Sequence, residues 1–263
     1  MAHLLKEKEI IQIFSKIITY ITDENSIGKD IFVSCIKEIL KKMQADSCYT
    51  VGKTIIPTLT KGIQHKNITI KELCFDTFND YINTFNYVLM KENDSVIKEK
   101  KLIFNCALQA ISIDNITLRK VCSNFLGNMA LIVKKDGLKE IMNLLIEEIS
   151  KNNSTIQVKI AYINALSSVI KNTTSKQVDH IGQVYKILSS YCNLSYLESH
   201  NSSTEEYDHS NELVESCLGI FEVYVLKLPK IMIVKAQELI DALVELIKYD
   251  PNYNGDVKQC RNR

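Results

Sequence analysis

The stretch GLKEIMNLLIEEIS, which spans residues 137–150, decides the fold class of this chain. Its apolar residues recur at the spacing that places side chains on one face of a helix: Leu138, Ile141, Met142, Leu145 and Ile149. A half-buried strand could not hold Leu144, Leu145 and Ile146 in succession, because neighbouring strand residues point to opposite faces. The stretch is therefore predicted to be an amphipathic helix.

The same periodicity extends along the chain and overrides the strand preference of its many isoleucines. It predicts helices at 4–21, 26–43, 48–65, 69–89, 95–112, 115–133, 137–150, 155–171, 177–192, 211–227 and 230–249. Only 8 Gly and 3 Pro occur in 263 residues, too few for the turns of a β-sandwich. The chain is therefore predicted to be all-α.

Pairs of these helices form units that begin near residues 26, 69, 115, 155 and 211. A two-helix repeat of about 40 residues is typical of HEAT and armadillo arrays. We predict a right-handed α-α superhelix, a solenoid of about five to six two-helix repeats. In this interpretation 1–249 is a single array with a half repeat at 1–21 and an inserted polar loop at 193–210, and 250–263 is a disordered tail.

The first predicted helix has no partner helix before it. Its apolar residues are expected to face the missing half of their unit and to leave an exposed apolar end: Ile10, Phe14, Ile17 and Ile18. A solenoid presents one long surface rather than a deep cleft. We therefore expect that surface, and not a pocket, to carry the function.

Composition and charge describe a soluble, intracellular protein. The 32 Lys and Arg residues are balanced by 31 Asp and Glu residues, and no basic cluster suits nucleic acid or a membrane surface. No apolar run approaches the ~20 residues of a membrane-spanning helix. The eight cysteines are dispersed without a CxxC pair, so we expect free thiols in a reducing compartment.

The sequence offers no catalytic, metal or cofactor site. Walker, GxGxxG and GxSxG motifs are absent. The best metal candidate is a polar segment that we interpret as a solvated loop, because nothing fixes ligand geometry there: His200, Glu205, Glu206, Asp208 and His209. We predict a protein that is not an enzyme and has no cofactor and no small-molecule substrate.

The hexapeptide YDPNYN follows the last predicted helix: Tyr249, Asp250, Pro251, Asn252, Tyr253 and Asn254. With LKEIMNLLIEEISKNN at 138–153, LRK at 118–120 and LPK at 228–230, it resembles the N-terminal HEAT array of the cullin-associated, neddylation-dissociated protein family. The order and spacing of these pieces are similar as well, so the resemblance covers nearly the whole chain. In the family an acidic tract follows the hexapeptide, whereas this chain continues GDVKQCRNR.

This resemblance implies a non-enzymatic clamp that wraps the RING-bearing end of an unmodified cullin together with its RING-box protein. Such a clamp would block neddylation of the cullin and support exchange of substrate adaptors in cullin-RING ubiquitin ligases. We expect it in the cytoplasm and the nucleus. The alternative is a HEAT scaffold of another pathway, such as a transport receptor or a phosphatase scaffold.

Contact residues are expected on the second helix of each unit, which we take to line the concave side of the solenoid. The polar stripes of these helices supply the candidate partner-binding residues: Lys98, Lys101, Asn105, Gln109, Lys139, Asn143, Glu147, Gln183, Lys186, Lys235, Asp241 and Glu245.

Overall fold

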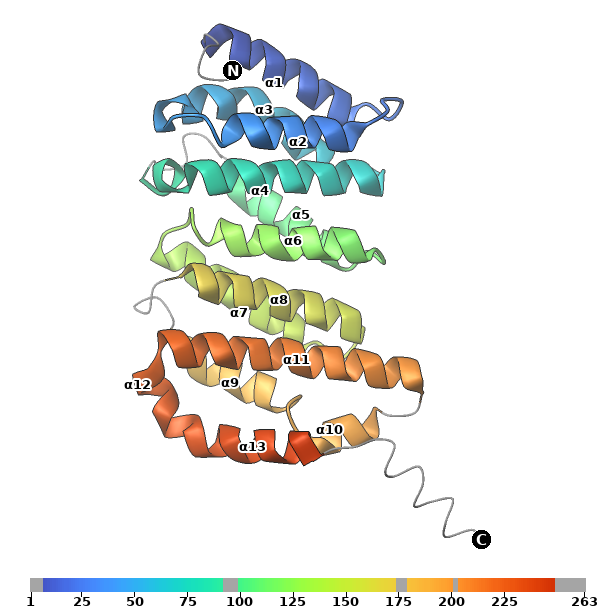
Figure 1. Ribbon diagram of the computed structural model, residues 1–263, viewed down its shortest axis with the longest axis vertical. Helices are drawn as coiled ribbons and strands as arrows, with labels where there is room; N and C mark the ends of the chain where they lie inside the picture. Colours follow the sequence, from blue (N-terminus) through green and yellow to red (C-terminus); the bar gives the residue numbers. More distant parts are fainter. Residues whose placement is uncertain (1–6, 92–98, 174–178, 201–202, 249–263) are drawn as a thin grey trace.

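The computed structural model describes residues 7–91, 99–173, 179–200 and 203–248. Of these residues 82% are helical and none lies in a strand, so the prediction of an all-α fold is confirmed. The helices stack along one long axis as an α-superhelical repeat (Figure 1). The predicted tail 250–263, the hexapeptide 249–254 and Lys98 lie outside the described residues.

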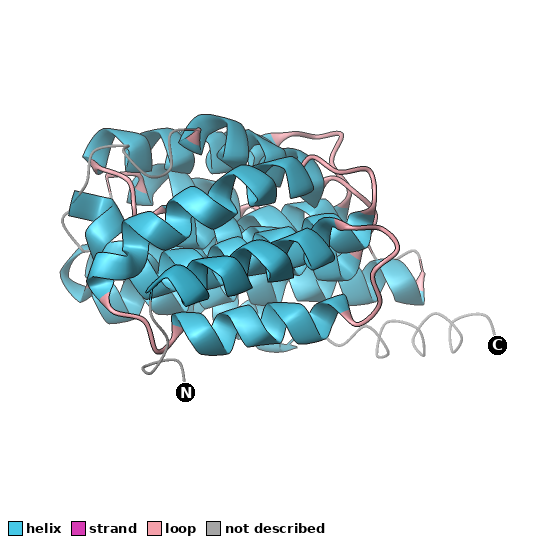
Figure 2. Ribbon diagram, turned by 90° about the horizontal axis from the view of Figure 1, so that it is seen from above, coloured by secondary structure: helices cyan, strands magenta, loops and turns pink. Residues whose placement is uncertain are grey.

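The helices form two layers (Figures 1 and 2). The first layer holds the first helix of each unit: α2 (Lys29–Leu40), α4 (Ile68–Lys91), α6 (Ile116–Met129), α8 (Ile156–Asn172) and α11 (Thr204–Lys227). The second layer holds the second helices: α3 (Cys48–Gly62), α5 (Lys100–Ile111), α7 (Lys135–Ser150) and α9 (Ile181–Ser189). Successive first helices contact one another directly, whereas successive second helices share few close backbone contacts.

Aromatic side chains fill the core between the early units. The ring of Phe125 on α6 lies 5.2 Å from Phe75 and 5.8 Å from Phe78, both on α4, with tilted or edge-on geometry. All three rings are fully buried. Aromatic pairs at this distance add specific geometry to the stability gained from burial, so they fix how α4 and α6 pack.

Small residues bring α6 and α8 close together. Gly127 lies against Ser168, and a Cβ atom placed on Gly127 would come within 2.2 Å of the Ser168 Cβ. Across the same interface the buried hydroxyl of Ser123 donates to the carbonyl of Ala161 at 2.8 Å. Larger side chains at these positions would force the two helices apart.

An asparagine ladder links three first helices. The side chain of Asn128 on α6 donates to Oδ1 of Asn79 on α4 at 2.9 Å. Asn172 at the end of α8 donates to the carbonyl of Gly127 at 3.0 Å and reaches Oδ1 of Asn128 at 3.4 Å. Because polar groups inside a protein are costly unless they are paired, the ladder fixes the register of α4, α6 and α8.

Tyrosine hydroxyls tie helices of different units together. Tyr81 of α4 donates to the carbonyl of Cys48 at 2.9 Å, and Tyr162 of α8 donates to that of Leu108 at 3.0 Å. Tyr191, just after α9, donates to the carbonyl of Ile149 at 3.2 Å. The bonds of Tyr81 and Tyr162 connect the first layer to second-layer helices. The bond of Tyr191 instead joins two parts of the second layer, α7 and the residues just after α9.

The N-terminal helix is covered, contrary to expectation. Helix α1 (Glu7–Thr22) packs on both α2 and α3, which contact it along the face that was expected to remain open. Phe14 and Ile18 are buried, and Ile10 and Ile17 are half-buried against the core. The prediction of an exposed apolar end here was wrong, because the following unit supplies the missing contacts.

The described residues 193–200 and 203–210 do not form the predicted polar loop. They hold α10 (Leu194–Ser199) and the first turns of α11. Asn193 caps α10 by accepting from the backbone of Tyr196 at 2.9 Å, and Leu197 is buried. Ser210 is buried as well, while His209 contacts the side chain of Gln157 on α8 at 3.0 Å. Contacts within the fold therefore hold the described ends of a segment that is polar in composition.

Helices α8 and α11 are joined at their C-terminal ends. The ammonium group of Lys227 donates to the carbonyls of Ile170 at 2.9 Å and Thr173 at 3.1 Å, and also to that of Lys171. Burial lowers the pKa of Lys227 from its ordinary value. A cation suits this position because the last carbonyls of a helix carry partial negative charge.

The predicted helix at 230–249 is broken into three parts. It consists of α12 (Pro229–Met232), a 3₁₀ turn at Ile233–Lys235, and α13 (Ala236–Lys248). No residue of α13 is fully buried. Large apolar side chains remain exposed here, including Ile233, Val234 and Ile247, so the open apolar end lies at this end of the described array.

The seven described cysteines are all free thiols, as expected. Burial raises the pKa of Cys74 to about 12. Among these cysteines, Cys35 is exposed and Cys106 is only partly buried, whereas the other five are buried. The apolar face of α2 passes through Val33 and Ile36 and leaves Cys35 outside it.

Candidate partner-binding surface

The predicted contact residues that the structure describes lie on the second helices and on the last two elements. Lys101, Asn105 and Gln109 are exposed on α5, Lys139, Asn143 and Glu147 on α7, and Gln183 and Lys186 on α9. Asp241 and Glu245 are exposed on α13, while Lys235 ends the 3₁₀ turn instead of lying on a helix. The candidates on α5 and α7 therefore lie on two helices that line one groove, whereas the other candidates lie on α9, the 3₁₀ turn and α13.

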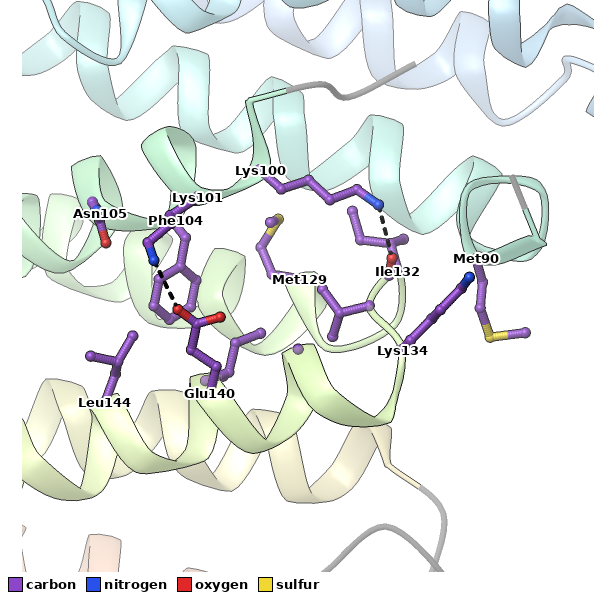
Figure 3. Close-up of a pocket in the computed structure, with 13 residues that line it drawn as sticks. Met90, Lys100, Lys101, Phe104, Asn105, Met129, Ile132, Lys134, Glu140 and Leu144 are labelled. Atoms are coloured by element: carbon purple, nitrogen blue, oxygen red, sulfur yellow. Dashed lines mark hydrogen bonds and ion pairs between the residues drawn. The ribbon is translucent and has the colours of Figure 1, made fainter. Parts of the chain in front are cut away.

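A groove of about 390 Å³ separates α5 from α7 (Figure 3). Buried apolar side chains contribute to its lining, namely Phe104, Met129, Ile132 and Ile141. The half-buried side chains of Val133 and Leu144 and the exposed Met90 complete the apolar part. Pockets that bind ligands or side chains typically have volumes of about 300–1,000 Å³ and mainly apolar walls, so this groove has the size and lining of a binding site.

Charged groups surround this apolar lining. Lys101 and Glu140 point toward each other across the groove, with Nζ and Oε1 3.2 Å apart (Figure 3). The ammonium group of Lys100 donates to the carbonyl of Ile132 at 3.3 Å. Lys134 and the amide of Asn105 also line the groove. Lys101 and Asn105 were predicted from the sequence as contact residues, whereas the apolar residues that line the groove were not.

Near the end of the array, Lys235 interacts with two neighbouring elements. Its ammonium group lies 2.8 Å from Oε1 of Glu238 and 5.3 Å from the ring centre of Tyr185 on α9. The hydrogen bond to Glu238 raises the pKa of Lys235. Asp241 accepts from the side chain of Gln237 one helical turn earlier, at 2.8 Å. These two predicted contact residues thus already have partners within the chain.

The first-helix layer carries a second groove of different chemistry. Its volume is about 450 Å³, and it lies among α6, α8 and α11. Most of the residues that line it carry amide, hydroxyl or charged side chains, with Asn124 and Asn164 at matching positions of α6 and α8. Arg119 also lines it, but its guanidinium is held by Asp114 at 2.9 Å and by the carbonyl of Ile111 at 3.3 Å.

Clusters that could hold a metal ion are absent from the described part of the chain. His209, one of the metal candidates, instead contacts Gln157. Among the described helices, none combines the length and apolar character needed to cross a membrane.

Several curated proteins with similar sequences are cullin-associated NEDD8-dissociated proteins. The chain is 20% identical over 259 residues to cullin-associated NEDD8-dissociated protein 1 of Arabidopsis thaliana, covering 96% of this chain and 19% of that protein. It is 23% identical over 210 residues to cullin-associated NEDD8-dissociated protein 2 of Rattus norvegicus, covering 79% of this chain and 15% of that protein. The resemblance to this family is confirmed. The chain spans less than a fifth of the length of either relative.

Solved structures support the solenoid fold. A solved structure of Kap95p comes from a study of its binding to RanGDP. It superposes on this chain with a TM-score of 0.56 at 10% identity, covering 94% of this chain and 35% of that chain. Kap95 in a complex with Nup1 gives a TM-score of 0.55 at 11% identity, covering 94% of this chain and 34% of that chain. At this identity the likeness concerns the fold alone. No family model matches the sequence. The cullin-associated relatives and the solenoid neighbours are regulators or scaffolds, not known enzymes.

Proposed function

We propose that this chain is part of a non-enzymatic scaffold that binds a cullin together with its RING-box protein. The observation that carries the proposal is the similarity to cullin-associated NEDD8-dissociated proteins along 96% of the chain. The solenoid supports it, because a long stack of helices offers the area that a large protein partner needs. The relatives and the fold neighbours are regulators or scaffolds, which favours a function without enzyme activity.

In this proposal the chain embraces the RING-bearing end of an unmodified cullin. Covering the lysine that accepts the modifier would block neddylation, and release of the cullin would allow exchange of substrate adaptors. We propose that this takes place in the cytoplasm and the nucleus, which imaging of the tagged protein would test. The second-helix side is the proposed contact face, since most candidate residues lie there.

The test is a pull-down of the purified cullin-RING pair by this chain, followed by a neddylation assay. The chain should retain the unmodified cullin, fail to retain the neddylated cullin, and slow attachment of the modifier in proportion to its concentration. Binding should be weaker than for a full-length relative, because this chain corresponds to less than a fifth of that length. A folded chain that retains neither form of the cullin would contradict the proposal.

Two controls separate this function from the alternatives. Ran serves as the control partner, because the fold neighbour Kap95p binds RanGDP according to its description. Retention of Ran without cullin would favour a transport scaffold. Replacing Lys139 by glutamate on α7 should weaken cullin binding more than the same change at the exposed Lys42, which lies just beyond the end of α2.

A further inference from the structure

We propose that the α5–α7 groove binds an extended acidic segment of a partner protein and receives one of its apolar side chains. This inference goes beyond the proposed function, since it concerns the chemistry of one groove and holds whether or not the partner is a cullin. It rests on three features of the groove: its apolar lining, its excess of lysines, and the weak ion pair across it.

The apolar lining calls for an apolar anchor. Phe104 on α5 and Ile141 on α7 both line the groove, and Leu144 extends the lining along α7. Met90 at the end of α4 is 49% exposed beside them. Methionine adapts its shape to different ligands, and removing apolar surface from water is the main source of affinity in such grooves. A leucine or phenylalanine side chain of a partner fits this chemistry.

The charges around the groove call for carboxylates on either side of that anchor. Among the described residues that line the groove, Lys101 and Lys134 are exposed cations, and Glu140 is the one carboxylate. Lys100 also lines it, but its ammonium group is already bonded to the carbonyl of Ile132. Lys134 is the N-cap residue of α7, where the end of the helix already carries partial positive charge. A cation is unfavourable at that position, so a bound anion would relieve the repulsion. The neighbouring Lys135 lies 3.5 Å from Asp179 and is thus partly compensated within the chain.

The ion pair across the groove can exchange its partner. Lys101 and Glu140 are 81% and 56% exposed, and ion pairs this exposed contribute little to stability. A carboxylate from the partner can therefore take the place of Glu140 at little cost. The bond from Lys100 to Ile132 remains in place and holds α5 against the end of α6.

The first experiment uses three fluorescent octapeptides and fluorescence anisotropy with the full 263-residue chain. The acidic peptide EDELFEDE should bind saturably. The peptide EDEAAEDE, without the anchor, and the neutral peptide QNQLFQNQ should each bind about tenfold or more weakly. A single-stranded oligothymidine serves as the polyanion control. Equal or tighter binding of the oligonucleotide or of EDEAAEDE would show that charge alone is recognised, and it would overturn the proposal.

The second experiment locates the site with matched variants. Lys101→Glu combined with Lys134→Glu should weaken EDELFEDE binding about tenfold, because two attractions become repulsions. Lys42→Glu with Lys66→Glu makes the same charge change at exposed positions outside the groove and should leave binding unchanged. Leu144→Gln on the groove wall should weaken binding, whereas Leu102→Gln should not, since Leu102 is on α5 but does not line the groove.

Circular dichroism melting of each variant shows whether it is folded, and the charge variants are at exposed positions that tolerate substitution. No saturable binding of EDELFEDE at up to about 1 mM, or equal binding by the groove and control variants, would overturn the proposal. Neither result would bear on cullin binding, which the pull-down measures separately.

Discussion

The close approach of α6 and α8 makes Gly127 the most informative position for testing the packing. A Cβ atom at this position would lie 2.2 Å from the Ser168 Cβ and 3.2 Å from the Cα and carbonyl carbon of the same residue. Two of these three atoms belong to the backbone, so a side-chain rotation cannot remove the clash. The substitution Gly127→Ala therefore has to push α6 and α8 apart.

The magnitude follows from two opposing effects. Alanine favours a helix over glycine by up to about 1 kcal/mol. Overpacking a tight interface costs about 1–3 kcal/mol. Gly219 on α11 supplies the control, because a Cβ atom there would meet nothing within 4 Å. Both substitutions gain the helix preference, so Gly127→Ala should be less stable than Gly219→Ala by about 1–3 kcal/mol.

The assay is urea unfolding monitored by circular dichroism. A double-mutant cycle compares Gly127→Ala, Ser168→Gly and the variant that carries both substitutions. Removing the Ser168 Cβ should restore part of the lost stability, because the closest clash disappears. A favourable coupling of about 0.5 kcal/mol or more is expected between the two sites. If Gly127→Ala were as stable as Gly219→Ala, the close approach of α6 and α8 would not exist in solution.

Three further outcomes are expected. Tyr81→Phe should lower the free energy of unfolding by about 1–2 kcal/mol, measured by urea titration, because the buried carbonyl of Cys48 loses its donor. Burial raises the pKa of the Asp80 carboxyl despite Lys37 at 3.4 Å, so the folded state holds this proton more tightly than the unfolded chain. Ionisation of Asp80 should therefore lower the free energy of unfolding as pH rises above about 4. Asp80→Asn should lack this loss, so the difference in urea midpoint between the variant and the wild type should grow with pH. Among the described cysteines, Cys35 should react first with a thiol reagent in the folded protein, and Cys35→Ser should remove that phase.

The helices were predictable because their apolar residues repeat with helical spacing. On α7, Leu138, Ile141 and Leu145 are buried as the pattern predicted. The helical turns described within 193–210 could not be predicted in this way, because the contacts that hold them involve residues far along the chain, such as His209 with Gln157. The break at Ile233–Lys235 also has no periodic signal, since the apolar pattern continues through the turn.

The candidate surface was predictable only in part. Helical spacing identified the exposed polar positions Lys101 and Asn105, which line the groove. It could not identify Phe104 or Leu144 as groove residues, because both resemble ordinary core positions on their own helices. They line a groove only because α5 and α7 approach each other without closing the gap, and this spacing is a property of the stack.

The chemistry of the two grooves indicates which layer should dominate partner affinity. In the first-layer groove, Asn124 and Asn164 would exchange bonds to water for bonds to a partner, which yields little net free energy. In the α5–α7 groove, burial of an apolar side chain beside Phe104 yields more, and a few such anchors usually carry most of the affinity. Asn124→Ala with Asn164→Ala should therefore change binding of the acidic anchor peptide EDELFEDE less than Leu144→Gln does, as measured by anisotropy. A larger loss from the asparagine pair would move the binding site to the first-layer side and contradict this ordering.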